Sequence, residues 1–137
     1  MKNRPSPIIP HGKAHDVWKL YGFTSPKELV LEDLAFAMGV LVMEGRLDGA
    51  EARLLRKGSR GIMRVKADIP EPGHKRFAIA HELGHWLLHG SVSQVLACTS
   101  EDMVAQYKGS EPEIEANYFA SALLMPVGPP AVIGTAR

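Results

Sequence analysis

The sequence predicts an α+β fold in which a small three-stranded antiparallel sheet packs against helices. Three observations support this prediction. A length of 137 residues fits one domain, which would bury roughly two thirds of its unfolded surface. Short apolar segments alternate with turn sequences in the first half, and longer segments with helical apolar spacing flank them. We expect a domain over residues 18–126, an extended N-terminal arm over residues 1–17 and a short C-terminal tail over residues 127–137.

The arm is predicted from its prolines. Pro5, Pro7 and Pro10 each remove a backbone donor and disfavour a helix at the preceding residue. The segment is therefore expected to be extended.

The first helix is expected within residues 25–39. Ser25 is placed to cap it, Pro26 suits the first turn, and Glu28 completes a capping box. Gly39 is expected to end the helix. One apolar stripe follows from the spacing of Leu31, Leu34, Ala35 and Met38.

The sheet is expected from three short segments. Residues 40–44, 51–56 and 62–67 are separated by the turn sequences LDG and KGSRG, which favour an antiparallel meander. The following sequence, IPEPG, is expected to close it.

Two further helices are expected in the second half. The pattern becomes helical over residues 75–89, and Gly90 marks its end. Residues 91–100 fit either a loop or a short strand, and residues 101–107 fit one or two helical turns. The last helix is expected over residues 110–125, with Ser110 as its cap and Pro126 as its stop.

Composition excludes several classes of partner and location. Lys and Arg number 16 against 15 Asp and Glu, so the net charge of +1 gives no electrostatic reason to expect nucleic acid or an acidic membrane as a partner. The single cysteine, Cys98, cannot form an intramolecular disulfide, which suits a reducing cytosol. The first residues contain no apolar stretch long enough for a signal peptide, and no run approaches the ~18 apolar residues of a membrane span. We therefore expect a soluble cytoplasmic protein.

The sequence HELGH, residues 81–85, predicts a metal site. On a helix, His81 and His85 lie on one face one turn apart, so both rings can reach one ion, and Glu82 lies beside them. Buried imidazoles need partners, and a metal ion would provide one. The rings are expected to point inward because they share a helix side with Phe77, Ala78, Gly84 and Leu88.

A catalytic zinc ion usually takes three protein ligands, so a third is needed. The pattern H-E-x-x-H-x-x-G-x-x-H is excluded because Leu88 and Ser91 occupy its last two positions. The 110–125 helix offers glutamates instead. At 100° per residue, Glu113 falls roughly 50° from the centre of the apolar face and Glu115 roughly 110° from it. Glu113 is favoured on this ground, with Glu115 as the alternative.

Other readings of the nearby residues stay open. Glu113 also fits a capping box with Ser110. Asn117, one turn further on, suits either a hydrogen bond that orients a ligand or a plain surface amide. His89 and Tyr118 are candidates for stabilising an oxyanion, or are structural. Cys98 is interpreted as a small buried apolar residue.

The two motifs HELGHWLLH and EIEANYFASALLMP, in this order, resemble the ImmA/IrrE family of zinc-dependent metallopeptidases. The resemblance covers roughly residues 25–126. It implies a zincin-like domain whose HExxH helix carries the active site, as in gluzincin-like enzymes. It also implies that His81, His85 and Glu113 are ligands of Zn²⁺ and that Glu82 is the catalytic base.

The resemblance further implies a substrate. Family members with assigned roles are regulators that cleave a helix-turn-helix transcriptional repressor. By this resemblance, such a repressor is the expected partner of this protein. The alternative is a module that binds a partner without cutting it, in a toxin–antitoxin or repressor system. Glu82 favours the enzyme, because a structural zinc site usually closes with four ligands, often Cys, and has no use for a general base.

Overall fold

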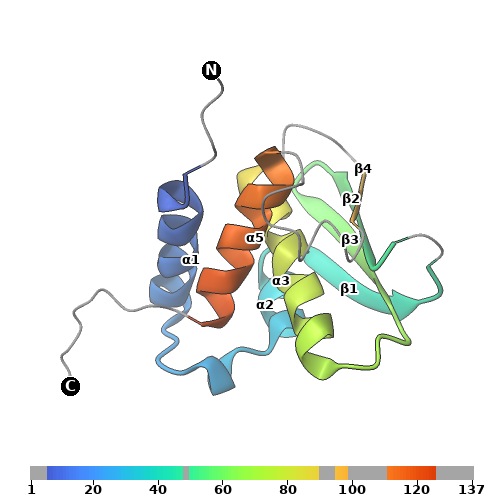
Figure 1. Ribbon diagram of the computed structural model, residues 1–137, viewed down its shortest axis with the longest axis horizontal. Coiled ribbons are helices and arrows are strands. Elements are labelled where there is room, and N and C mark those ends of the chain that lie inside the picture. The colour runs from blue at the N-terminus through green and yellow to red at the C-terminus, as the bar shows by residue number, and fades with distance from the viewer. Residues whose placement is uncertain (1–5, 48–49, 90–94, 99–110, 126–137) are drawn as a thin grey trace.

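The computed structural model describes residues 6–47, 50–89, 95–98 and 111–125, and it has an α+β architecture. The helices lie on one side of the sheet, and α5 lies between α1 and α3 (Figure 1). The α+β class is therefore confirmed. In chain order the elements are α1 (Ile8–Tyr21), a 3₁₀ helix (Pro26–Glu28), α2 (Leu31–Ala37), β1 (Val40–Gly45), β2 (Ala52–Lys57), β3 (Arg60–Lys66), α3 (Pro72–Leu88), β4 (Val95–Cys98) and α5 (Glu111–Leu124).

The sheet is mixed, so the predicted antiparallel meander is wrong. Its strand order is β1-β3-β2-β4, with β1 parallel to β3 and β2 antiparallel to both of its neighbours. The parallel pairing of β1 with β3 is accommodated by a close approach at Gly39, whose φ is +93°. A Cβ there would lie 2.6 Å from the Ser59 carbonyl oxygen, and the Gly61 N–H donates to the Gly39 carbonyl. The start of β1 thus lies beside the start of β3, and the two strands run in the same direction.

The other strands agree better with the sequence. Strands β2 and β3 form the expected hairpin, with Gly58 at a φ of +64° in the turn. The ambiguous segment contains a strand, β4, which pairs with β2 and adds a fourth strand to the three expected. The predicted turns at 101–107, the Ser110 cap and the side chain of Cys98 lie outside the described part.

Residues 8–21 form helix α1, so the prediction of an extended arm over residues 1–17 is wrong for this part. Pro7 stands just before the helix and Pro10 lies in its first turn, where a missing N–H breaks no helical hydrogen bond. The helix is held by burial against α5 and by a hydrogen bond of 2.9 Å from Trp18 Nε1–H to the Leu123 carbonyl. Its buried residues are Pro10, Ala14 and Val17.

The expected helix within residues 25–39 is two helices. The capping box at Ser25 and Glu28 is present, but it begins only the 3₁₀ helix, and α2 starts at Leu31. The two helices are separated at Leu29, whose backbone is extended and whose side chain is only 2% exposed. In this conformation its side chain enters the core, and its carbonyl accepts a hydrogen bond of 3.0 Å from Arg76 Nη1 on α3.

Helix α3 is fixed on the sheet through Trp86. The indole packs on Gly61 so closely that a Cβ at Gly61 would lie 2.6 Å from the ring. Its Nε1–H donates to the Met38 carbonyl. The guanidinium of Arg56 lies 3.5 Å from the ring centroid and donates to the Trp86 carbonyl. These contacts set the position of the helix that carries both histidines.

Helices α3 and α5 approach each other at Gly84. A Cβ at this position would lie 3.1 Å from the Cα of Ala116 and 3.2 Å from the Cβ of Phe119, closer than nearly all Cβ contacts in proteins. A side chain at residue 84 would therefore push the two helices apart. This approach brings the first turn of α5 next to the histidines of α3.

Of the helices that the structure describes, none has the length and apolar character needed to cross a membrane. The cytoplasmic location stays a prediction.

Candidate metal centre

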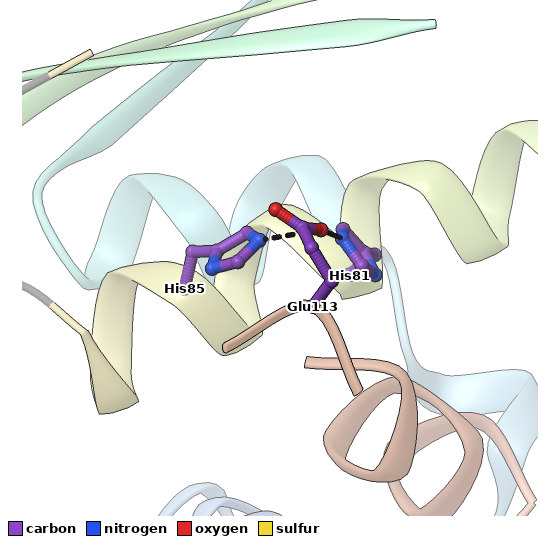
Figure 2. Close-up of side chains that lie close together, drawn as sticks. All are labelled: His81, His85 and Glu113. Carbon is purple, nitrogen blue, oxygen red and sulfur yellow. Dashed lines mark hydrogen bonds and ion pairs between the residues drawn. The ribbon is translucent and has the colours of Figure 1, made fainter. Parts of the chain in front are cut away.

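Three side chains from two helices meet at one point. His81 and His85 lie one turn apart on α3, and Glu113 lies in the first turn of α5. The Glu113 Oε1 atom lies 2.8 Å from His81 Nε2 and 3.1 Å from His85 Nε2 (Figure 2). One possible ligand atom from each residue lies within 4.8 Å of the other two.

Both histidines are buried. His81 is 0% exposed and His85 is 1% exposed, which confirms that this face of α3 points inward. Glu113 is only partly buried, so the carboxylate lies at the outer side of the group. The arrangement leaves one side of the group closer to solvent.

The orientation of the His81 ring is fixed by Asn117. The ring Nδ1 lies 2.8 Å from Asn117 Oδ1, an atom that can only accept, so Nδ1–H donates to it. A neutral His81 ring therefore has its lone pair on Nε2, the atom that faces Glu113. Of the two readings of Asn117, the structure supports the one in which it orients His81.

The pKa of His81 is raised and the pKa of Glu113 is lowered. Burial alone would raise the pKa of Glu113, but hydrogen bonds and charges from His81 and His85 outweigh it and hold the pKa well below its usual 4.5. Burial alone would lower the pKa of His81, but the hydrogen bond to Glu113 and the charges of Glu82 and Glu113 raise it above 6.5. Without a metal ion, an imidazolium and a carboxylate face each other.

These shifts predict how the stability of the metal-free protein depends on pH. The lowered pKa of Glu113 stabilises the fold above 4.5, and this stabilisation is lost as the pH falls through the folded value. The raised pKa of His81 stabilises the fold below 6.5 and is lost as the pH rises through the folded value. We expect the contribution of this pair to be greatest between pH 4.5 and 6.5, as measured by urea unfolding of chelator-treated protein.

The matched control for this prediction is Glu113→Gln, which removes the charge that raises the pKa of His81. The difference in unfolding free energy between the two proteins should shrink above pH 6.5. A difference that grows steadily towards pH 9 would contradict the pairing.

The residues of this group fit a metal ion. Two imidazole nitrogens and a carboxylate oxygen form a donor set that zinc prefers, and three protein ligands leave one position open. The hydrogen bond from His81 Nδ1 to Asn117 is the kind of outer contact that orients a histidine ligand. Binding would require His81 to lose the proton it shares with Glu113.

Glu82 lies on α3 between the two histidines in sequence. It is 0% exposed, and its charge contributes to the raised pKa of His81. A buried carboxylate is costly unless positive charge or hydrogen-bond donors lie near it. A metal ion on the neighbouring histidines would supply such a charge.

The other residues that the sequence suggested for the site lie outside the group of three ligand side chains. Glu115, the alternative third ligand, has its Oε1 atom 2.7 Å from His89 Nε2 and does not belong to the converging group. His89 is buried, and its other ring nitrogen lies 3.1 Å from His85 Nδ1. The ring of Tyr118 makes an edge contact with His11 on α1. The oxyanion role of His89 or Tyr118 stays a prediction.

The pKa of His89 is lowered by burial, against the opposing effect of Glu115. The link between His89 and Glu115 was not predicted from the sequence. One signal was present: His81, His85 and His89 follow one another at intervals of four residues, which places all three on one helix face.

Comparison with known proteins gives one family. The Peptidase_M78 family model, described as the IrrE N-terminal-like domain, matches residues 35–130. The matched range contains β1 to β4, α3 and α5, and with them every residue of the group. No curated protein matches the chain.

Proposed function

Because the chain belongs to the Peptidase_M78 (ImmA/IrrE) family, we propose that it is a zinc-dependent metalloendopeptidase with His81, His85 and Glu113 as metal ligands. The observation that carries this proposal is the convergence of their ligand atoms within 4.8 Å. The zincin-like, gluzincin-like class of the enzyme is part of the same proposal. It is supported by the HExxH sequence on α3 and by a glutamate from a second helix.

A zinc ion at this site would polarise the scissile carbonyl and lower the pKa of a bound water towards about 7. Residues of the chain would orient the ligands and transfer the proton. Asn117 holds the His81 ring in one orientation through the hydrogen bond at Nδ1, which leaves Nε2 for the metal ion. Glu82, the next residue along α3, accepts the proton of the attacking water and then donates it to the leaving amine.

The burial of Glu82 suits this role. A carboxylate shielded from bulk water keeps its proton affinity under the control of the neighbouring charges, and it can return the proton to the leaving group. His85 and His81 lie on either side of it in the helix, so the base and the metal share one short rigid segment.

The substrate that we propose is a helix-turn-helix transcriptional repressor. The support is the resemblance to regulators of this family that cut such repressors. The proposal also places the protein in the cytoplasm, where its substrate would be found.

The experiment uses a repressor encoded beside the gene of this protein. Zinc-loaded protein should cut it at one or a few sites, and a chelator should stop the reaction, because the proposed mechanism uses the metal ion to activate the attacking water. Mass spectrometry of the products would identify the new termini. A stable complex without new termini, formed equally well by Glu82→Gln, would refute the peptidase and support a binding module.

A further inference from the structure

Beside the proposed metal ligands, His89 and Glu115 form a chain of hydrogen bonds that ends on His85. His85 Nδ1 lies 3.1 Å from His89 Nδ1, and His89 Nε2 lies 2.7 Å from Glu115 Oε1. His85 is on α3 and His89 directly follows the end of that helix, whereas Glu115 comes from α5. The two helices are thus joined at this point as well as at Glu113.

The chemistry of these atoms gives the chain a direction. A carboxylate can only accept, so His89 donates its Nε2–H to Glu115. In a neutral His89 ring, Nδ1 then carries the lone pair, and it must be the acceptor in the contact with His85. His85 therefore donates its Nδ1–H to His89, which leaves Nε2, the nitrogen on the side of Glu113, as the ring atom that would bind a metal ion.

Burial makes this direction hard to reverse. His89 is only 7% exposed, so its ring nitrogens have little access to water, and each nitrogen has a partner within the protein. The Glu115 side chain is 35% exposed and forms the outer end of the chain. A histidine ligand whose second nitrogen donates to a fixed acceptor is held in one tautomer and one orientation.

We propose that His89 and Glu115 are positioning residues that hold His85 in the tautomer with Nε2 free for the metal ion. This inference rests on the proposed metal site. They do for His85 what Asn117 does for His81. Each ligand histidine thus has its own outer partner, and the two partners are of different chemical type. Neither His89 nor Glu115 touches the position of the metal or of a substrate through this contact.

The experiment compares two substitutions at His89. His89→Leu removes the acceptor for His85 Nδ1–H and should lower the zinc affinity by about 10–100-fold, as for other outer-shell changes. His89→Gln keeps a carbonyl oxygen that can accept from His85 and an amide that can donate to Glu115, so it should restore most of the affinity. Zinc affinity is measured by competition with a chromophoric chelator.

A second measurement observes the proton directly. In the zinc-loaded wild-type protein, ¹⁵N NMR should show a slowly exchanging proton on His85 Nδ1, and in His89→Leu, which removes its acceptor, that proton should exchange faster with water. The partly exposed residue Glu115 provides a variant that leaves the core intact. Glu115→Ala should weaken zinc binding in the same direction, whereas Glu111→Ala, an exposed carboxylate on the same helix, should not.

The outcomes separate this inference from the proposed function. If the wild type binds zinc but cuts nothing, the peptidase is refuted and the positioning role can still be measured. Equal zinc affinities and equal exchange rates of the His85 Nδ1 proton in wild type, His89→Leu and Glu115→Ala would overturn the positioning role. Equal losses in His89→Leu and His89→Gln would overturn it too, because they would show a role in packing alone.

Discussion

Glu113→Ala is expected to lower zinc affinity by more than about a hundredfold, beyond the range of outer-shell changes. The reason is geometric. Glu113 Oε1 is the atom that lies within 3.1 Å of both histidine Nε2 atoms, and alanine leaves two ligands where a catalytic zinc site needs three. Elemental analysis of the purified variant and chelator competition would measure the loss.

The control for this prediction is Glu115→Ala, on the same helix. That variant keeps all three proposed ligands, so its zinc affinity should fall only within the smaller range expected for an outer partner. If Glu115→Ala strips the metal while Glu113→Ala retains it, the third ligand is Glu115 and the placement of Glu113 has no bearing on metal binding.

Glu82→Gln is expected to keep zinc and to reduce peptide cleavage by about 10²–10⁴-fold, the usual contribution of general acid–base catalysis. Glutamine has nearly the same shape as glutamate, so the buried position of residue 82 remains filled. It cannot accept the proton of the attacking water. The measurement is kcat/KM on the repressor, together with the zinc content of the same sample.

The comparison for this variant is His85→Ala, which should lose zinc and activity together. Loss of zinc in Glu82→Gln would show that residue 82 acts on the metal itself and that the assigned roles are wrong. Retained cleavage with full zinc content would exclude Glu82 as the base.

The parts of the site that the sequence predicts are those that a single helix determines. His81 and His85 are one turn apart whatever surrounds them, and the apolar residues on the same side predict that they are buried, as they are. The position of Glu113 near the apolar face of its own helix also depends on one helix alone. In the structure this residue lies beside the histidines.

The contacts that the sequence did not predict depend on how two segments meet. The bond between His89 and Glu115 exists because α3 and α5 cross closely, and neither helix alone shows where the other passes. The parallel pairing of β1 with β3 likewise depends on the contact of Gly39 with Ser59, 20 residues further along the chain. Turn sequences suggest a meander, but they do not determine which strands become neighbours.

Helix α1 shows a different limit of prediction from sequence. Proline content predicted an extended segment over residues 1–17, yet burial against α5 gives a helix from Ile8 to Tyr21. In a helix interior proline removes a hydrogen bond and its ring clashes with the carbonyl four residues earlier, and Pro10 lies too near the helix start for either effect. Packing of an apolar face decided this element.

The absence of a side chain at Gly84 has a thermodynamic consequence for metal uptake. Because the backbones of α3 and α5 are in direct contact there, the spacing of the helices is determined during folding and not by an arriving ion. The conformational entropy of bringing His81, His85 and Glu113 together is lost when the core forms. The apparent affinity for the ion is then reduced very little by the cost of organising its ligands, which is the advantage of a preorganised receptor.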